Sequence, residues 1–432
     1  MEFSRSEILP GVFLNHLRTD KFKTACLSVT LLTQLSRDTA SVNALIPFVL
    51  RRGTTRYSDM EQLSMRMDEL YGTAVEPVVR RIGEIQCIGF YASFPEQTYL
   101  PGAASLLGEV TELTGQLLLS PVTRGGLLLP AYVDSEKEKL ADLIRSQIND
   151  KRSYAVKRCL EEMCCCEDFA VSRYGTAEDC ESVGYKKLTK RYRSLLQTCP
   201  VEVFYCGRSE EDAVIAALRD ALSTLPRGEI NYDIGTDVRM NALEDHVRTV
   251  EEAMDVTQGK LVMGFRLGEC MEEPDIAALN VFNCVFGSGT TSKLFMNVRE
   301  KLSLCYYASS ICYTHKGIML VHSGIDFDRF EDAKQEILAQ LDAVRKGEIT
   351  DEELTAAKRG VASDLRAAMD SQGELEGFWL SQALDGLDYS PTELAEQVEQ
   401  VTKEDVMEIA RSVECDLIYF LKGQEADGDG EN

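Results

Sequence analysis

Hydrophobic and polar positions follow the same order twice along the chain. Each half begins with an alternating strand pattern, continues with helical stretches and a pair of strands, and is closed by long helices. In the first half these patterns cover residues 24–32, 40–52, 60–70 and 74–94, with Ile88, Phe90, Ala92 and Phe94 on one strand face. In the second half they cover residues 261–267, 274–286, 292–302, 305–313 and 317–325. A tandem duplication is the simplest interpretation.

Strands and helices mixed in this order predict an α+β protein with two homologous domains, each an antiparallel-rich sheet covered by helices. We expect the domains at 1–230 and 231–423, because hydrophobic periodicity lapses over 226–245. An acidic, glycine-rich tail, 424–432, is predicted to be disordered. Three capping-box patterns predict helix starts: Ser58 with Glu61, Thr350 with Glu353, and Thr402 with Asp405.

The charge of the chain narrows the class of partners. Seventy-one acidic against 46 basic residues give a formal net charge of −25 among 432 residues. A field of that sign repels phosphate backbones and anionic lipid, so we expect neither a nucleic-acid partner nor a membrane partner. The N-terminus lacks a secretory pattern, and no apolar run approaches the ~18 residues that span a bilayer. We therefore expect a cytoplasmic protein.

Cysteine and histidine offer little evidence for a metal site. The densest cysteine cluster, Cys159, Cys164, Cys165 and Cys166, contains no CxxC, and successive helical cysteines point in different directions. Without an export signal, reduced and mostly buried thiols are expected. Only four histidines occur, and no pair has helical spacing beside a glutamate. The sequence contains neither a Gly-x-Ser-x-Gly elbow nor a P-loop.

The segment 44–54, Ala-Leu-Ile-Pro-Phe-Val-Leu-Arg-Arg-Gly-Thr, resembles the start of the catalytic domain in the pitrilysin/insulinase metallopeptidase family. That family carries His-x-x-Glu-His on a helix, followed by a basic residue and Gly-Thr. Aligned on the Gly-Thr pair, the zinc histidines fall on Ala44 and Phe48, and the general-base glutamate falls on Pro47. Methyl and phenyl groups offer zinc no lone pair, and proline cannot accept a proton from water.

The third zinc ligand of that family is a glutamate on a later helix, which the segment 136–145 resembles. By spacing, the ligand position is Leu143, and a slip of one residue would instead place Asp142 there. A lone carboxylate does not make a three-ligand site. We therefore expect this chain to bind no metal and to have no catalytic residue of its own.

The second half retains more of the family pattern. Residues 286–295 and 298–307 resemble the C-terminal-domain signature of a glycine-rich turn, a helix with Arg-Glu-Lys and a strand with tyrosine. The resemblance implies that Arg299 and Tyr306, with Tyr307 as an alternative, hold the peptide backbone and the developing oxyanion at a zinc site. Guanidinium and phenol donors suit that role. The structural alternative is that Arg299 pairs with a neighbouring acid and Tyr306 packs at a sheet end.

The resemblance implies the pitrilysin fold, a concave half-shell, and a non-catalytic subunit of a heterodimeric zinc peptidase. The partner would be a homologous subunit carrying His-x-x-Glu-His and the zinc, and the substrate would be a peptide. Residues 149–155 resemble a bacterial branch that lacks the histidine motif and is associated with modification of elongation factor P. Two alternatives stay open: a scaffold protein without a role in proteolysis, and an autonomous peptidase that uses unfamiliar residues.

Overall fold

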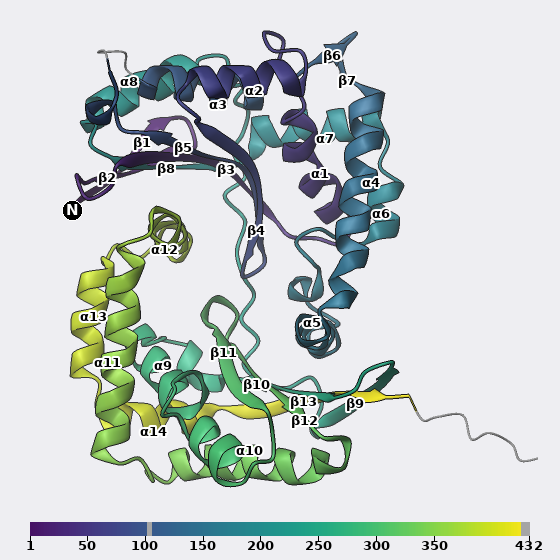
Figure 1. Cartoon of the computed structure of the whole chain (residues 1–432), viewed down its shortest axis with the longest axis vertical. Coiled ribbons are helices and arrows are strands. Elements are labelled where there is room, and N and C mark those ends of the chain that lie inside the picture. Colours follow the sequence, from purple (N-terminus) through teal and green to yellow (C-terminus); the bar gives the residue numbers. More distant parts are fainter. Residues whose placement is uncertain (102–105, 425–432) are drawn as a thin grey trace, which may run out of the picture. The chain divides into compact units, whose positions relative to one another are not determined.

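The computed structural model describes residues 1–101 and 106–424, which fold into two compact units (Figure 1). Unit 1 contains residues 1–146, 171–235 and 371–387, and unit 2 contains residues 147–170, 236–370 and the chain from 388 on. Each unit combines one main sheet with helices, so the predicted α+β class with two sheet-bearing domains is confirmed. The predicted tail, 424–432, lies outside the described residues from position 425 on.

The sheet of unit 1 has six strands in the order β1-β2-β8-β3-β5-β4. All neighbouring strands are antiparallel except β2 and β8, which are parallel. The strands are β1 (Glu2–Leu9), β2 (Val12–Arg18), β3 (Thr24–Gln34), β4 (Ala74–Ile82), β5 (Ile85–Pro95) and β8 (Val201–Gly207), and a separate hairpin pairs β6 (Thr123–Arg124) with β7 (Leu127–Leu128).

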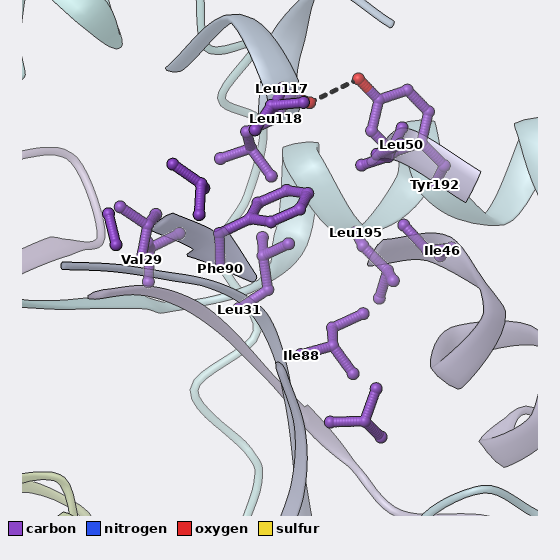
Figure 2. Packing of buried hydrophobic residues seen from close by; sticks show 14 of the residues in the cluster. Val29, Leu31, Ile46, Leu50, Ile88, Phe90, Leu117, Leu118, Tyr192 and Leu195 are labelled. Atoms are coloured by element: carbon purple, nitrogen blue, oxygen red, sulfur yellow. Dashed lines mark hydrogen bonds between the residues drawn. The ribbon is translucent and has the colours of Figure 1, made fainter. Parts of the chain in front are cut away.

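Helices cover one face of this sheet and form the larger core of the molecule. Alternate residues of β3 and β5, among them Val29, Leu31, Ile88 and Phe90, pack against these helices (Figure 2). The hydroxyl of Tyr192 donates to the carbonyl of Leu118 at 2.6 Å, which satisfies the phenol inside the core. The unit 1 helices, apart from one described below, are α1 (Ala40–Leu50), α2 (Met60–Glu69), α3 (Leu106–Leu119), α4 (Pro130–Ser146), α6 (Ala177–Glu181), α7 (Tyr185–Thr198) and α8 (Glu211–Ala221).

The sheet of unit 2 repeats this arrangement with one strand fewer. Its order is β11-β12-β10-β13-β9, and β13 and β9 are its one parallel pair. In chain order its five strands occupy the positions of β2, β3, β4, β5 and β8, so the predicted repeat of elements is present in the topology as well. The strands are β9 (Arg248–Met254), β10 (Gly259–Arg266), β11 (Tyr307–Tyr313), β12 (Ile318–Ile325) and β13 (Glu414–Gly423).

The helices of unit 2 include two π-helical segments, which are rare in proteins. The helix α9 (Ile276–Asn283) runs directly into the π-helix η5 (Cys284–Ser288), and a second π-helix, η6 (Leu294–Lys301), follows. The remaining helices are α10 (Phe330–Arg345), α11 (Asp351–Ala368), α13 (Pro391–Gln400) and α14 (Lys403–Ser412). Among the helices in the described ranges, none is long and apolar enough to cross a membrane.

The two units exchange one helix each. Helix α5 (Lys151–Met163) follows α4 of unit 1 but belongs to unit 2, and α12 (Gln372–Asp385) follows α11 of unit 2 but belongs to unit 1. The units therefore differ from the continuous division 1–230 and 231–423 in these two segments, and their main boundary falls after residue 235. Each exchanged helix comes directly after the long helix that the repeat places at the same point of its half.

Helix α12 packs on the face of the unit 1 sheet that the other helices leave open. Leu380 joins the buried cluster of Leu32, Ile85 and Cys87, and the indole of Trp379 stacks on Phe3 with ring centroids 3.4 Å apart. Two side chains fix the helix to strands: Glu376 pairs with Arg80, and Gln372 donates to the carbonyl of Thr24 at 2.9 Å.

Helix α5 is fixed to the unit 2 sheet by a buried ionic cluster just beyond its C-terminus. Arg266 is fully buried, and it donates to Glu167 at 2.6 Å and to Asp416 at 2.9 Å. Lys316, also fully buried, lies 2.8 Å from the same Glu167 carboxylate. Removing one partner of such a cluster leaves a buried charge unpaired, at a cost of about 3–5 kcal/mol. Glu167 therefore anchors the segment after α5 to the sheet of unit 2.

Two of the three predicted capping boxes are confirmed, and one is wrong. Thr350 and Thr402 cap α11 and α14 with their reciprocal acidic partners. At α2 the N-cap is Asp59, not Ser58, and its carboxylate accepts from the backbone amide of Gln62 at 2.9 Å. A carboxylate one residue later offers a stronger acceptor than the serine hydroxyl, which explains the shift.

Candidate functional site

The helix that aligns with the zinc helix is embedded in the core of unit 1. Ala44 and Pro47 are buried, and Phe48 packs half-buried against the main hydrophobic cluster. Figure 2 shows Ile46 and Leu50 of the same helix among core side chains. Nearly every α1 residue faces other protein atoms, so hydrocarbon fills the positions where the family would hold metal.

The buried polar side chains of α1 are already hydrogen-bonded to other protein groups. Asn43 donates to Gln86 at 2.8 Å and accepts from the guanidinium of Arg191 at 2.7 Å, and Gln86 donates to the carbonyl of Ala40 at 3.0 Å. Asn43 and Gln86 are fully buried. This closed network satisfies the buried amides, which leaves them no capacity for a ligand.

On α4 the third ligand position is exposed and apolar. Leu143 is 44% exposed, and the neighbouring carboxylate of Asp142 points to solvent, 3.7 Å from Arg145. The acid of α4 that is buried is Glu136, which pairs with Arg52 at 2.9 Å and with Lys139 at 2.8 Å. Two cations thus already neutralise the one carboxylate that this helix directs inward.

These positions do not fit zinc. Ala44, Pro47, Phe48 and Leu143 present no donor atom, and within residues 1–101 and 106–424 no three His, Cys, Asp or Glu side chains are grouped as metal ligands. The cysteine cluster does not form a metal site either. Cys159 and Cys164 are buried, whereas Cys165 and Cys166 are exposed beyond the end of α5.

In unit 2, the glycine-rich turn brings the π-helices close to the sheet. A Cβ atom on Gly287 would lie 2.4 Å from the hydroxyl of Ser310 on β11, so only glycine permits this approach. Ser310 in turn donates to the side chain of Asn283 at 2.6 Å. The π-helix η6 is anchored by the buried Leu294 and Val298, which leaves its opposite side open.

Arg299 lies on that side, near the end of η6. Its side chain is 41% exposed, its guanidinium lies 4.8 Å from the ring centroid of Phe295, and its Nε is 3.5 Å from Glu300. Stacking on Phe295 orients the guanidinium plane while donors stay accessible. Glu300 is the neighbouring acid with which Arg299 was expected to pair if its role is structural. Their ion pair is long and exposed, so it contributes little to stability.

A strained turn connects Arg299 to Tyr306. Ser303 adopts a left-handed backbone with φ of 51°, and the amide of Leu304 reaches back to the carbonyl of Val298 at 3.0 Å. A non-glycine residue in this region costs roughly 1–2 kcal/mol. Strain of this kind clusters at functional sites, where the surrounding structure holds it in place.

Tyr306 lies immediately before β11, and 61% of its surface is exposed. Its backbone amide donates to the carbonyl of Gly324 at 2.8 Å, and its hydroxyl donates to Asp326 at 3.2 Å. The nearby Asp326 carboxylate raises the pKa of the phenol, so Tyr306 remains a hydrogen-bond donor through the neutral range. Asp326 is a partner that sequence reasoning did not identify.

The following residue, Tyr307, has a different environment. It is half-buried, and the guanidinium of Arg152 lies 4.4 Å from its ring centroid. Arg299 and Tyr306 flank the same strained turn, yet their side chains contact Phe295, Glu300 and Asp326 rather than each other. The i, i+4 spacing of Phe295 and Arg299 was the sequence signal for the stacking that orients the guanidinium.

Comparisons with known proteins agree with this geometry. Residues 182–361 match the family model described as the Peptidase M16 inactive domain. Over 417 residues, covering 96% of each chain, the sequence is 32% identical to the probable inactive metalloprotease YmfF of Bacillus subtilis.

Solved structures show the same fold over the whole chain. A conserved protein from Enterococcus faecalis superposes with a TM-score of 0.88 at 26% identity, covering 98% of this chain and 100% of that one. A peptidase M16 inactive domain from Pseudomonas fluorescens superposes with a TM-score of 0.79 at 15% identity, covering 99% of each chain. The chain belongs to the M16, or pitrilysin/insulinase, metallopeptidase family, as a homologue without the zinc motif.

Proposed function

We propose that this chain is the non-catalytic subunit of a heterodimeric zinc peptidase. In this role it binds peptide with Arg299 and Tyr306 at the zinc site of a homologous partner that carries His-x-x-Glu-His. The observation that carries the proposal is the contrast between the two halves of the family pattern. The zinc positions are filled with hydrocarbon, whereas the side chains of Arg299 and Tyr306 are exposed. The single hydroxyl proton of Tyr306 is held only by a long hydrogen bond to the exposed Asp326.

The chemistry of the two side chains supports the assigned roles. A guanidinium is a permanent cation, and its planar fork matches a peptide carbonyl or carboxylate. A phenol hydroxyl donates to a developing oxyanion, and removing one such donor costs about 10²–10³-fold in turnover. Tyr306 is favoured over Tyr307 because Tyr306 is open to a ligand, whereas Arg152 lies over the ring of Tyr307.

The first experiment identifies the partner. The chain is purified under mild conditions from its own cells, the associated proteins are identified by mass spectrometry, and zinc is assayed in the same sample. We expect a stoichiometric homologue with His-x-x-Glu-His, about one zinc per pair, and peptidase activity that requires both chains. A metal-free chain in a stable assembly without peptidase activity would instead support the scaffold role.

The second experiment tests the two residues in the reconstituted pair. Arg299→Ala and Tyr306→Phe are each expected to lower peptide turnover by ~10²-fold. Matched controls are Arg329→Ala, which removes an exposed arginine of unit 2, and Tyr232→Phe, which changes an exposed tyrosine of unit 1. Both controls should leave turnover unchanged. Full activity of the Arg299 and Tyr306 variants would overturn their assignment.

A further inference from the structure

Four side chains from four elements of unit 2 meet on one face of its sheet. Arg152 comes from α5, Lys260 from β10, Tyr307 from β11 and His322 from β12. The guanidinium of Arg152 lies 4.4 Å and the ammonium of Lys260 lies 6.0 Å from the ring centroid of Tyr307. The rings of Tyr307 and His322 have centroids 5.8 Å apart. We call this group the Arg152–Tyr307 cluster.

A glycine makes room for the cluster. Tyr307, Gly324 and Lys260 are in register across three neighbouring strands. A Cβ atom on Gly324 would lie 2.5 Å from Cε1 of Tyr307, so the tyrosine ring occupies the space that a side chain at 324 would need. The ring thereby lies close to both cations, whereas a side chain at 324 would displace it.

The cluster carries more positive than negative charge. The side chain of Arg152 is exposed and forms no ion pair with other described residues, and Lys260 donates to the amide oxygen of Gln258. Burial, and then the charge of Arg152, lower the pKa of Lys260. The acid that acts on both Lys260 and Tyr307 is Asp150, whose Oδ1 already accepts from the backbone amides of Arg152 and Ser153 at the start of α5.

Two further polar groups of the cluster lack partners among the described residues. The hydroxyl of Tyr307 makes no hydrogen bond with them, and Nδ1 of His322 is buried without a partner in a residue that is 2% exposed. Burial lowers the pKa of His322 to about 4, so the ring is neutral near pH 7. A buried polar atom without a partner is uncommon in folded proteins and calls for an explanation.

We propose that the Arg152–Tyr307 cluster binds a carboxylate group of a peptide. Two cations face one carboxylate, that of Asp150, so the cluster has an excess of positive charge beside a free phenol donor. This excess favours an anion, and a guanidinium fork matches a planar carboxylate. Phosphate is disfavoured because Asp150 already occupies the first backbone amides of α5, which are the donors that phosphate uses at helix N-termini.

This inference rests on the proposed function in one respect: the carboxylate is taken to belong to a bound peptide. Tyr307 directly follows Tyr306 on the chain, so the two candidate peptide-binding groups are neighbours at the start of β11. The carboxylate belongs either to the C-terminus of the peptide or to an internal Asp or Glu side chain. Both share the chemistry that the cluster recognises.

The test measures binding to the isolated full chain by titration calorimetry, without a partner subunit or zinc. Three peptides of one neutral sequence are compared: one with a free C-terminal carboxylate, one with a C-terminal carboxamide, and one carboxamide with a single internal glutamate. We expect at least one carboxylate peptide to bind roughly tenfold or more tightly than the neutral carboxamide. The peptide that shows the gain identifies the source. Equal binding of all three would overturn the proposal.

Variants locate the site. Arg152→Gln removes an exposed cation and should abolish the preference for carboxylate, and Tyr307→Phe should reduce it. Arg359→Gln on α11 removes another exposed arginine of unit 2 and should leave the preference intact. A preference that survives Arg152→Gln, or binding of inorganic phosphate in place of the peptides, would overturn the assignment. Because no partner is present, failure here is distinguishable from failure of the heterodimer.

Discussion

Two regions of this chain that resemble family motifs, helix α1 and the segment from η6 to β11, have opposite environments. Helix α1 in unit 1 is closed to ligands, in the sense that nearly all its side chains are buried and its polar groups are already hydrogen-bonded. Ala44 is fully buried, and the side-chain amide of Asn43 is hydrogen-bonded to Gln86 and Arg191. The segment from η6 to β11 in unit 2 is open and irregular, with a π-helix, a left-handed Ser303 and exposed donors. At α1 the residues at the zinc-equivalent positions contribute to core packing. Irregular backbone persists where something holds it in place.

The largest effect on stability is expected when the two histidines of the family motif are introduced into α1. Ala44→His with Phe48→His restores the two histidine positions, yet one imidazole must enter a fully buried site. We expect the free energy of unfolding to fall by about 2–4 kcal/mol, from overpacking and an unsatisfied polar ring. We expect no stoichiometric zinc. Urea unfolding and a zinc assay on the same sample test both expectations.

A matched substitution on α4 serves as the control. Leu143→Glu changes an exposed position and should alter stability by less than about 0.5 kcal/mol. Zinc bound one to one by the double histidine variant, at an unchanged urea midpoint, would show that α1 is not closed.

A smaller effect is expected at the irregular turn of unit 2. Ser303→Val places a β-branched residue at φ of 51° and should lower the free energy of unfolding by about 1–2 kcal/mol. Ser303→Gly accepts this backbone and should change stability much less. Urea midpoints of the two variants make the comparison. Equal stability of valine and glycine at 303 would mean that the turn relaxes and carries no strain.

The smallest effect is a pH dependence that arises in unit 2. The pKa of His322 is lowered to about 4 by burial, whereas the unfolded chain binds that proton near pH 6.5. Stability is therefore fully present above pH 6.5 and declines as pH falls toward 4, by less than about 1 kcal/mol between pH 7 and 6. Urea titrations at both pH values measure the slope.

The slope is assigned to one residue by comparing two variants. His322→Gln should remove this part of the decline, while His246→Gln, which changes an exposed histidine, should not. An undiminished slope in His322→Gln would assign the pH dependence to other groups.

Local patterns predicted the elements of this fold well, because periodicity and caps act over a few residues. The alternation through Ile88 and Phe90 and the capping boxes at Thr350 and Thr402 all appear as expected. The error at Ser58 arose because two neighbouring residues, Ser58 and Asp59, both make good N-caps, and the sequence alone does not decide between them.

Contacts between residues far apart in the chain could not be predicted from such local patterns. Nothing in the amphipathic helix α12 indicates which sheet it covers. Its Glu376 pairs with Arg80, 296 positions away in the chain, and its Trp379 stacks on the still more distant Phe3. Family spacing predicted the zinc-equivalent positions and the role of Arg299, and these assignments stay predictions. It did not reveal that Tyr307 and His322 lie near Arg152, since strand register and the packing of α5 create that proximity.

The helix exchange has a consequence for how the chain is made. A ribosome releases the N-terminal half first, but the strands that cover Cys159 and Met163 of α5 are synthesised only later. Unit 1 in turn lacks one of its helices until residues 371–387 have emerged. Unit 1 is therefore incomplete until α12 has emerged, and unit 2 is incomplete until β13 has emerged. In the meantime their apolar faces are exposed, and holdase chaperones bind such surfaces.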